Sequence, residues 1–293
     1  MFDIINIEKP ETLEVALKML SGNPNLKIIA GGTDVLVRMH NGTLSEVELL
    51  SLRDIAGMDE ISILEDGTIS IGAMATFAQL FRNDIINKYL PVLSEAAVSV
   101  GGPQVRNMGT IGGNICNGAV SADSATTMLA YDAALKLVSP AGTRIIQVRE
   151  FYAGPGKVHL LPGEILTNIL ISEDNYRKTS GCYIKYSNRK AMDIAILGVS
   201  VVCKAEAGKF TDVRIALGVA APTPIRCTEA ETYARGKDIT EETLKEIGKY
   251  AIKSSKARDS WRASKSYREH LIEILTIRAL KEAVRRSGGA DIE

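Results

Sequence analysis

Two short segments that join paired glycines to small polar residues constrain this chain more than any other feature. The first reads Ile28-Ile29-Ala30-Gly31-Gly32-Thr33-Asp34-Val35 and follows a strand-like stretch, and the second reads Thr110-Ile111-Gly112-Gly113-Asn114. Glycine has no Cβ, permits positive φ and lets backbone N–H groups approach a ligand closely. Consecutive N–H groups that point into one concavity form an anion site, to which Thr33 and Thr110 could add hydroxyl donors. Two such segments could hold a pyrophosphate from opposite sides.

The common nucleotide-binding motifs do not occur in this sequence. Neither segment matches G-x-G-x-x-G, and no G-x-x-x-x-G-K followed by Ser or Thr is present. Either glycine pair alone would be explained by a tight structural turn. Taken together, with the second pair inside a long polar stretch, they leave a structural turn and a ligand-binding loop as open alternatives.

The composition bounds the classes of protein that the chain can form. Hydrophobic residues make up 45% and charged residues 24% of the 293 residues, which suffices for a normal core and for two domains or one large one. Lys plus Arg and Asp plus Glu each number 35, so the formal net charge is +0. A nucleic-acid binder would need excess positive charge to neutralise phosphates, and we therefore expect no nucleic-acid partner.

No segment has the properties of a targeting signal or a membrane span. Residues 1–10 carry acidic residues where a signal peptide would carry basic ones, and they contain no long apolar stretch. The longest apolar run, 195–203, is about half of what a bilayer crossing needs. We expect a soluble, cytoplasmic protein without a membrane partner.

The cysteines and histidines are too scattered to indicate a metal site. No pair of cysteines has the spacing of a zinc or iron–sulfur ligand set, so reduced thiols used as small apolar residues are the expected role. We expect no metal in this chain. The residues concerned are Cys116, Cys182, Cys203 and Cys227, with His40, His159 and His270.

Hydrophobic periodicity predicts an α/β first part. Thr12 is positioned to cap a helix whose apolar residues recur at helical spacing up to Leu20. A short strand over 26–30 leads into the first glycine pair, and Thr33 is positioned to cap a helix that reaches Arg38. The pattern further predicts strands at 61–63, 69–71, 134–138, 143–148 and 165–171, helices at 77–81 and 90–98, and a long functional loop at 101–124.

The last third of the chain reads as strands followed by helices. Strands are predicted at 182–186, 197–205 and 213–219, with a hairpin turn at Gly208-Lys209, and helices at 240–254 and 264–286. This order indicates a small α+β domain, with antiparallel strands on one side and helices on the other.

The glycine segments resemble the two FAD-pyrophosphate loops of the molybdenum hydroxylase flavoproteins, a family that includes the medium subunits of xanthine dehydrogenase and carbon monoxide dehydrogenase. The resemblance covers nearly the whole chain. Gly102-Pro103-Gln104-Val105-Arg106-Asn107 leads into the second loop and Ser121-Ala122-Asp123-Ser124 follows it, as in the family. Residues 218–226 and 261–268 are similar to the family's C-terminal domain, while 114–118 and 153–157 most resemble bacterial FAD subunits of xanthine dehydrogenase.

The resemblance implies an α+β fold in two domains. Residues 1–175 would form an α/β FAD-binding region of the PCMH type, with subdomains at about 1–55 and 56–175. Residues 180–285 would form a C-terminal α+β domain like that of the carbon monoxide dehydrogenase flavoprotein. This division agrees with the helix and strand pattern.

The resemblance also implies which residues would hold the FAD pyrophosphate. Ile28, Ile29, Ala30, Gly31, Gly32, Thr33, Asp34 and Val35 would wrap it through backbone N–H groups. Thr110, Ile111, Gly112, Gly113 and Asn114 would complete the clasp, with the Thr110 and Asn114 side chains as donors.

Four further positions match the family, each with an ordinary structural alternative. Asp123 matches a position near the adenosine ribose, but it could instead cap a helix from Ser124 onward. Ile165 and Leu166 match positions that pack on the adenine or its surroundings, and plain strand residues would look the same. Lys185 matches a lysine near the flavin ring, and an exposed strand lysine is the alternative.

The resemblance implies a subunit that binds FAD non-covalently and transfers electrons, without catalytic residues for the substrate chemistry. A separate molybdopterin-binding subunit would hydroxylate the substrate, and a separate iron–sulfur subunit would pass electrons from its clusters to FAD. NAD+ is the expected final acceptor, and xanthine dehydrogenase of purine metabolism is the expected enzyme. Covalent flavin attachment is not expected, because neither loop has His or Cys at the clasp positions.

Three alternatives remain open from the sequence. The chain could be the flavin subunit of another molybdenum hydroxylase, acting on nicotinate, an aldehyde, a purine derivative or carbon monoxide, since the molybdenum chain sets the substrate. It could be a self-contained flavin reductase on the related fold, which would need a substrate pocket and an acid residue for which no motif is found. It could be a regulatory or scaffold protein whose flavin never cycles.

Overall fold

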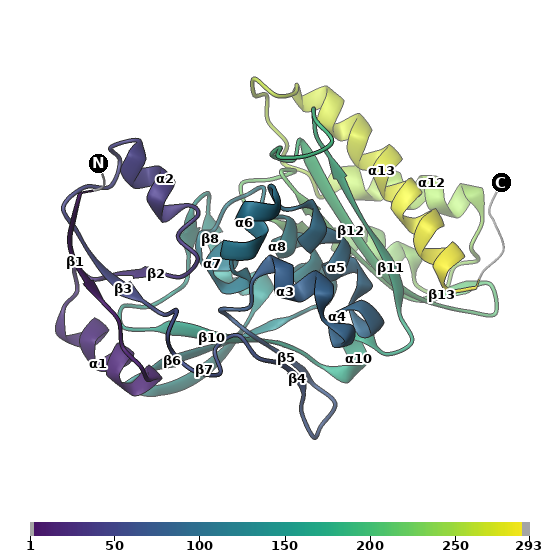
Figure 1. The fold of residues 1–293 in the computed structure, drawn as a ribbon. Coiled ribbons are helices and arrows are strands. Elements are labelled where there is room, and N and C mark those ends of the chain that lie inside the picture. Colours follow the sequence, from purple (N-terminus) through teal and green to yellow (C-terminus); the bar gives the residue numbers. More distant parts are fainter. Residues whose placement is uncertain (1–2, 289–293) are drawn as a thin grey trace.

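The computed structural model describes residues 3–288, whose helices and strands form three regions that lie side by side (Figure 1). A small N-terminal sheet lies at one end, a larger sheet with a layer of helices in the middle, and a third sheet with long helices at the other end. The largest buried apolar cluster belongs mainly to the middle region, and a second cluster lies between the third sheet and its helices. The α+β fold class that the sequence predicts is confirmed.

The N-terminal sheet is parallel and has the order β1-β3-β2. Thr12 caps the first helix as predicted, with Oγ1 accepting from Val15 N at 3.3 Å. The predicted cap at Thr33 is wrong, because the glycine turn extends through Thr33 and the next helix is preceded by Asp34, whose side chain makes no capping bond. The elements are β1 (Ile4–Glu8), α1 (Leu13–Gly22), β2 (Lys27–Ile29), α2 (Val35–His40) and β3 (Val47–Ser51).

The middle sheet is antiparallel and has the order β4-β5-β10-β6-β7. Both predicted hairpins are confirmed, the first pairing Ile61 with Ile71 and the second pairing Val138 with Thr143. Its strands are β4 (Ile61–Ile63), β5 (Ile69–Gly72), β6 (Ala134–Ser139), β7 (Gly142–Gln147) and β10 (Ile165–Ile171). The connections around β10 contain α9 (Val148–Phe151), β8 (Tyr152–Gly154), β9 (Lys157–Val158) and α10 (Glu173–Tyr176).

A layer of short helices covers one face of the middle sheet (Figure 1). The predicted helices are found as α3 (Phe77–Arg82) and α5 (Pro91–Ser99), with α4 (Asp84–Tyr89) between them. The long loop predicted at 101–124 is wrong, because this stretch contains α6 (Pro103–Met108), α7 (Ile111–Cys116) and the start of α8 (Asp123–Ala130). Pro103 in the first turn and Thr110 as a capping residue start two of these helices, and these local signals outweigh the surrounding glycines.

The third sheet is antiparallel and has the order β11-β12-β13-β14, with helices packed on one face. The predicted order of strands followed by helices is confirmed. Its other face lies against α5 and α8 of the middle region, where Ser200 Oγ donates to Thr126 Oγ1 at 3.0 Å. The elements are β11 (Ser180–Tyr186), β12 (Leu197–Glu206), β13 (Lys209–Gly218), β14 (Ile225–Arg226), α11 (Thr228–Ala234), α12 (Glu241–Lys253) and α13 (Lys265–Arg286).

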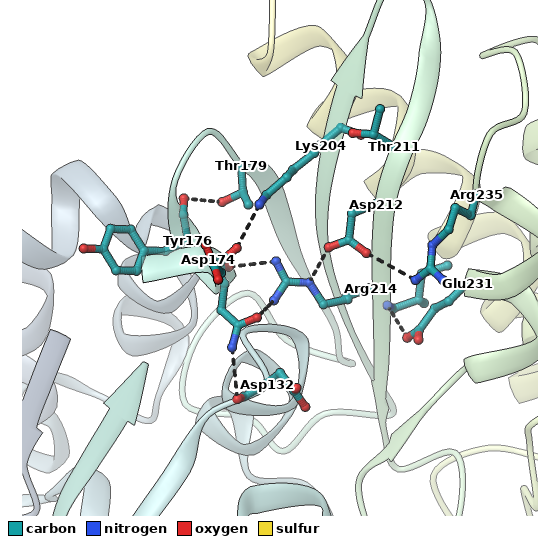
Figure 2. Close-up of polar contacts among 12 residues, drawn as sticks. Asp132, Asp174, Tyr176, Thr179, Lys204, Thr211, Asp212, Arg214, Glu231 and Arg235 are labelled. Atoms are coloured by element: carbon teal, nitrogen blue, oxygen red, sulfur yellow. Dashed lines mark hydrogen bonds and ion pairs between the residues drawn. The ribbon is translucent and has the colours of Figure 1, made fainter. Parts of the chain in front are cut away.

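A polar network joins the third sheet to the middle region (Figure 2). The buried guanidinium of Arg214, on β13, donates from Nη2 to the carbonyl O of Asn175 at 2.7 Å and from Nη1 to its Oδ1 at 3.0 Å. The Nε atom of Arg214 lies 3.1 Å from Oδ2 of Asp212, and the exposed Arg235 approaches the other oxygen of Asp212 at 3.7 Å. The two bonds from Arg214 to Asn175 cross from one region to the other, while Asp212 and Arg235 hold the Arg214 side chain within the third region.

Candidate functional site

A cavity of about 300 Å³ lies among the loop after β2, the start of α7 and the start of β10, and we call it the cofactor cavity. It brings together most of the residues singled out from the sequence, although they come from distant parts of the chain. Those that line it are Ile28, Ala30, Gly31, Gly32, Thr33, Asp34, Val35, Thr110, Gly112, Gly113, Asn114, Ile165 and Leu166.

Two residues of the glycine segments point elsewhere. Ile29 packs against the small core of the N-terminal sheet, and Ile111 is fully buried in the core of the middle region. Their backbone belongs to the two glycine segments, but their side chains stabilise the fold instead of lining the cavity.

The first glycine segment carries a run of unpaired backbone donors. Within residues 3–288, no acceptor is found for any amide from Ala30 to Val35, although the next amide, Leu36 N, donates to Gly32 O at 2.9 Å. Backbone N–H groups are otherwise almost always paired when water is excluded from them. Consecutive free amides that line one cavity form a nest for an anion.

The two glycines of this segment are required for different reasons, Gly32 for its backbone conformation and Gly31 for a close backbone contact. Gly32 has a φ of +75°, which L side chains rarely adopt. Gly31 lies against the end of α6, two residues before the second segment, where a Cβ would lie 1.8 Å from the carbonyl O of Met108. A side chain at Gly31 would therefore push the first glycine segment away from the end of α6.

The second glycine segment uses most of its amides inside the protein, so it does not offer a run of free amides as the first segment does. It forms the capped start of α7. Gly112 is required there because a Cβ would lie 2.6 Å from the carbonyl O of Ala73. The amides of this segment donate from Ile111 to Ala75 O at 2.9 Å, from Gly112 to Ala73 O at 2.8 Å, from Gly113 to Thr110 Oγ1 at 3.1 Å and from Asn114 to Thr110 O at 3.0 Å.

The second segment has three hydrogen-bond donors available for a ligand, one backbone amide and two side chains. The N–H of Thr110 has no acceptor in the part of the chain that the structure describes. The Thr110 hydroxyl accepts from Gly113 N and keeps its own proton for donation. Asn114 Oδ1 accepts from Ser124 Oγ at 2.7 Å, which leaves the Asn114 Nδ2 group as the donor on the cavity side. Thr110 and Asn114 therefore remain suitable as side-chain donors.

The apolar end of the cavity is formed by Ile165 and Leu166 at the start of β10, which are 0% and 4% exposed. Glu164, just before them, is held by Arg144 of β7 through two bonds of 2.5 and 2.8 Å and by Leu161 N at 2.7 Å. The hydrogen bond from Arg144 holds the pKa of Glu164 below its usual value, although burial opposes this shift. This ion pair fixes the position at which β10 enters the cavity wall.

Asp123 and Lys185 do not line the cavity but form an ion pair with each other. Lys185 Nζ, on β11, lies 2.9 Å from Oδ2 of Asp123, on α8, and donates to the carbonyl O of Ser99 at 3.0 Å. The hydroxyl of Tyr183 donates to the other oxygen of Asp123 at 2.5 Å. Burial raises the pKa of Asp123, while the Lys185 charge and the hydrogen bonds from Tyr183 and Lys185 act in the opposite direction.

This ion pair lies next to the cavity wall. Ser99 precedes Val100, which lines the cavity, and Asn114 bonds to Ser124, the residue after Asp123. Both structural alternatives for the pair are wrong. The Lys185 side chain is only 11% exposed, and the residue that precedes α8 is Ala122, with no capping bond from a side chain.

Several residues of the cavity were not predicted, most of them apolar. Val105 belongs to the stretch that leads into the second segment, so the family resemblance contained a signal for it. Phe77 and Val100 lie at the ends of helices, where their apolar character is indistinguishable from that of core residues. The additional lining residues are Arg38, Leu52, Ala73, Met74, Phe77, Val100, Val105, Gly109, Cys116, Asn117 and Leu160.

The fold is that of an α+β protein with a cavity along which a run of backbone amides is free to bind an anion. The model of the FAD binding domain in molybdopterin dehydrogenase matches residues 3–172, and that of the CO dehydrogenase flavoprotein C-terminal domain matches residues 182–283. The chain belongs to this family of FAD-binding subunits of molybdenum-dependent oxidoreductases.

Individual relatives agree with this assignment. The chain is 42% identical over 289 residues to a putative xanthine dehydrogenase FAD-binding subunit of Escherichia coli, with 99% of each chain covered. It is 30% identical to the glyceraldehyde dehydrogenase medium chain of Sulfolobus acidocaldarius, covering 94% of this chain and 96% of the relative. Among solved structures, carbon monoxide dehydrogenase from Hydrogenophaga pseudoflava matches with a TM-score of 0.92 at 28% identity, covering 98% of this chain and 99% of that one.

The described residues contain neither a candidate membrane span nor a candidate metal centre. No helix in 3–288 combines the length and the hydropathy that a bilayer span requires. The same residues contain no group of three or more His, Cys, Asp or Glu side chains arranged to hold a metal ion.

Proposed function

We propose that this chain holds FAD non-covalently in the cofactor cavity and serves as the electron-transferring flavin subunit of a xanthine dehydrogenase. The observation that carries the proposal is the run of unpaired amides from Ala30 to Val35 along an otherwise largely apolar cavity. The FAD pyrophosphate is the part of the cofactor that needs such donors, and the rings need apolar walls.

The donors and apolar walls support one orientation of the cofactor. The pyrophosphate would lie against Ala30 to Val35, with Thr110 and Asn114 completing its contacts, and the adenine would pack on Ile165 and Leu166. This proposed orientation directs the flavin ring toward the other side of the cavity, where Val100 and Asn114 lead to the Asp123–Lys185 pair.

The ion pair changes one role that the family resemblance implies. Adenosine ribose and flavin ring are separated by the pyrophosphate in an extended FAD, yet Asp123 and Lys185, expected at these two places, are 2.9 Å apart. Two side chains in contact with each other cannot lie at opposite ends of an extended ligand. We therefore assign both residues to the flavin side.

The chemistry of the cavity supports a non-covalent complex. Cys116 is the one described lining residue with a nucleophilic thiol, and burial raises its pKa to about 12. A thiol that stays protonated at neutral pH is a poor nucleophile toward a flavin ring.

FAD, when bound, supplies reversible acceptance and release of electrons. The residues of this chain would bind and orient it. The amides from Ala30 to Val35 would neutralise diphosphate charge, and Lys185, already fixed by Asp123 and the Ser99 carbonyl, would present an oriented ammonium near the ring. No residue of the cavity is assigned a bond-making role.

The substrate chemistry would take place on partner chains. Relatives are described as medium chains or FAD-binding subunits of dehydrogenases, including those for nicotinate and carbon monoxide. We propose a molybdopterin-binding subunit and an iron–sulfur subunit as partners, with NAD+ as the final acceptor. Xanthine is favoured as substrate because identity is 42% to the xanthine dehydrogenase subunit, against 32% and 30% to the nicotinate and carbon monoxide relatives.

The test has two parts. The purified full chain should release intact FAD on denaturation, and it should oxidise NADH with an artificial dye while leaving xanthine unchanged. Addition of the molybdopterin and iron–sulfur chains should restore electron transfer from xanthine to NAD+. Flavin that stays attached after denaturation, or xanthine oxidation by this chain alone, would contradict the proposal.

A further inference from the structure

A second cavity, of about 380 Å³, lies between the middle region and the third sheet and shares no lining residue with the cofactor cavity. Its walls come from Val120, Ser121 and Pro155 on one side, and from residues beside the third sheet on the other, namely Ile194, Ala195, Val219, Ala221 and Pro222. The segment that joins α12 to α13 closes it with Lys256, Arg258 and Arg262, and Arg268 on α13 completes it. We call it the cationic cavity.

The charges in this cavity are of one sign. No acidic residue is found among its described lining residues, and none of its four cations forms an ion pair within residues 3–288. Arg262 stacks on the exposed Trp261 ring at 4.1 Å from its centroid, and Asp259, the acid of the same segment, accepts from Lys265 N at 2.7 Å. Unneutralised positive charge between two low-dielectric walls attracts anions.

Arg268 is the most informative of these cations because it is buried, at 3% exposure. Its Nη1 donates to the carbonyl O of Ile196 at 2.7 Å and its Nη2 to Ser260 Oγ at 2.7 Å, whereas its buried Nε has no partner in the described part of the chain. Burial lowers the pKa of Arg268, and the nearby charges of Arg258 and Arg262 lower it further. A buried guanidinium beside two like charges is destabilising unless an anion joins them.

The backbone around these cations is held in place. Ala220 O accepts from Lys256 N at 2.9 Å and from Ser255 Oγ at 3.0 Å, which fixes the start of the cationic segment. Val219, beside Ala220, has a φ of +64°, a conformation that costs a β-branched residue free energy. Its N–H donates to Val120 O at 3.2 Å, across to the opposite wall. Strain of this kind persists where the surroundings impose it, and it is concentrated at binding sites.

The cationic cavity lies close to the proposed flavin side. Ser121, in its wall, is two residues from Asp123, the partner of Lys185. Ala195, in the opposite wall, precedes Ile196, whose N–H donates to Tyr186 O at 2.7 Å next to Lys185 on β11. The same two stretches of chain therefore connect the cationic cavity to the Asp123–Lys185 pair.

We propose that Lys256, Arg258, Arg262 and Arg268 form a binding site for a phosphate-bearing anion. Guanidinium groups match phosphate oxygens in geometry as well as in charge. Two sources carry this chemistry: the diphosphate of a dinucleotide that exchanges electrons with the flavin, and inorganic phosphate or pyrophosphate. The first source rests on the proposed function of the chain, whereas the anion site does not.

The test is calorimetric titration of the FAD-loaded full chain with inorganic pyrophosphate and, separately, with NAD+, which does not reduce the flavin. The natural chain should bind pyrophosphate, and sodium chloride should weaken this binding. Replacement of two accessible cations, in Arg258→Gln/Arg262→Gln, should raise the dissociation constant of pyrophosphate about tenfold for each arginine lost. These side chains make no hydrogen bond in the structure, so the variant is expected to fold, whereas Arg268 has a structural role as well.

Arg278→Gln is the control for the loss of one positive charge, because it removes a single arginine from an exposed position on α13 outside the cavity. If the double variant binds both pyrophosphate and NAD+ more weakly, by a similar factor, the ligand is identified as the dinucleotide diphosphate. If only the binding of pyrophosphate is weakened, the anion site is supported and the dinucleotide is excluded as its ligand. No binding of pyrophosphate by the natural chain, or equal weakening in Arg278→Gln, overturns the proposal. Flavin absorbance in the same samples reports separately on the proposed function, since loss of FAD with pyrophosphate binding retained overturns only that function.

Discussion

The ammonium of Lys185, on β11 of the third sheet, lies 2.9 Å from the carboxylate of Asp123, on α8 of the middle region. Both side chains are nearly buried, at 11% and 7% exposure. The pair therefore joins two regions of the fold across a boundary from which water is excluded. It also stands at the proposed flavin side, so its loss would affect both stability and cofactor binding.

Removal of one partner of this pair should be more harmful than removal of both charges. Lys185→Met leaves Asp123 buried without its counter-ion, and we expect it to lower the free energy of unfolding by about 3 kcal/mol. Lys185→Met/Asp123→Asn leaves no unpaired charge and should recover part of that loss. Urea unfolding of the natural chain, the two single variants and the double variant checks this, and strictly additive losses would rule out the coupling.

Gly32→Ala should weaken FAD binding at least about tenfold while lowering stability by about 1 kcal/mol. The reason is the φ of +75° at Gly32, which a side chain resists and which sets the direction of the free amides. Gly42→Ala is the control, because Gly42 has a φ of +70°, would have nothing within 4 Å of an added Cβ and lies outside the cavity lining. Fluorescence titration of the FAD-free chain measures affinity. Equal FAD affinity in the two variants would contradict the role of this turn.

Arg214→Met should destabilise the protein much more than Arg235→Gln, although both arginines face Asp212. The Arg214 side chain is 6% exposed and bonds Asn175 across the region boundary, whereas the Arg235 side chain is 65% exposed and lies 3.7 Å from Asp212. We expect a loss of about 3 kcal/mol for Arg214→Met and below about 1 kcal/mol for Arg235→Gln. Chemical unfolding of both variants checks the difference, and similar losses would show that the network in Figure 2 contributes little.

Glu164→Gln should destabilise the protein at neutral pH but not in acid. Because the hydrogen bond from Arg144 holds the pKa of Glu164 below its ordinary value, the ionised form stabilises the folded state. That stabilisation is complete above the unfolded pKa of about 4.3 and is lost as pH falls through the folded pKa. We expect a difference of about 2 kcal/mol at pH 7 that shrinks below about pH 4. Unfolding curves from pH 7 to pH 3 test it, and a difference independent of pH would argue against the ion pair.

The sequence predicted correctly those helices and hairpins whose capping residue or turn lies next to them in the chain. Thr12 caps α1 through its own neighbour Val15, and the hairpin residues Ile61 and Ile71 pair because a turn of fixed chemistry lies between them. The same logic failed at 101–124, where single residues such as Pro103 and Thr110 start very short helices within a glycine-rich stretch.

Which groups of the site are available to a ligand depends on contacts between distant parts of the chain, which no local sequence pattern predicts. The glycine segments were found because glycine is needed wherever backbone approaches closely, but the sequence could not reveal which amides are free. The amides of Ile111 and Gly112 donate hydrogen bonds to the carbonyl groups of Ala75 and Ala73, which lie in a different part of the chain. Likewise, Lys185 looks like an exposed strand residue until Asp123, 62 residues away in sequence, is brought to it.

The contact of Gly31 with the carbonyl of Met108 fixes the distance between the first glycine segment and the end of α6, just before the second segment, through the protein's own backbone. In the proposed complex, the protein alone sets the width of the gap, and we expect little conformational entropy to be lost when FAD enters. In such a preorganised site, the strength of the complex is expressed mainly in how slowly the cofactor leaves. We therefore propose that the glycine at this position affects the residence time of FAD without contributing a side chain to its recognition.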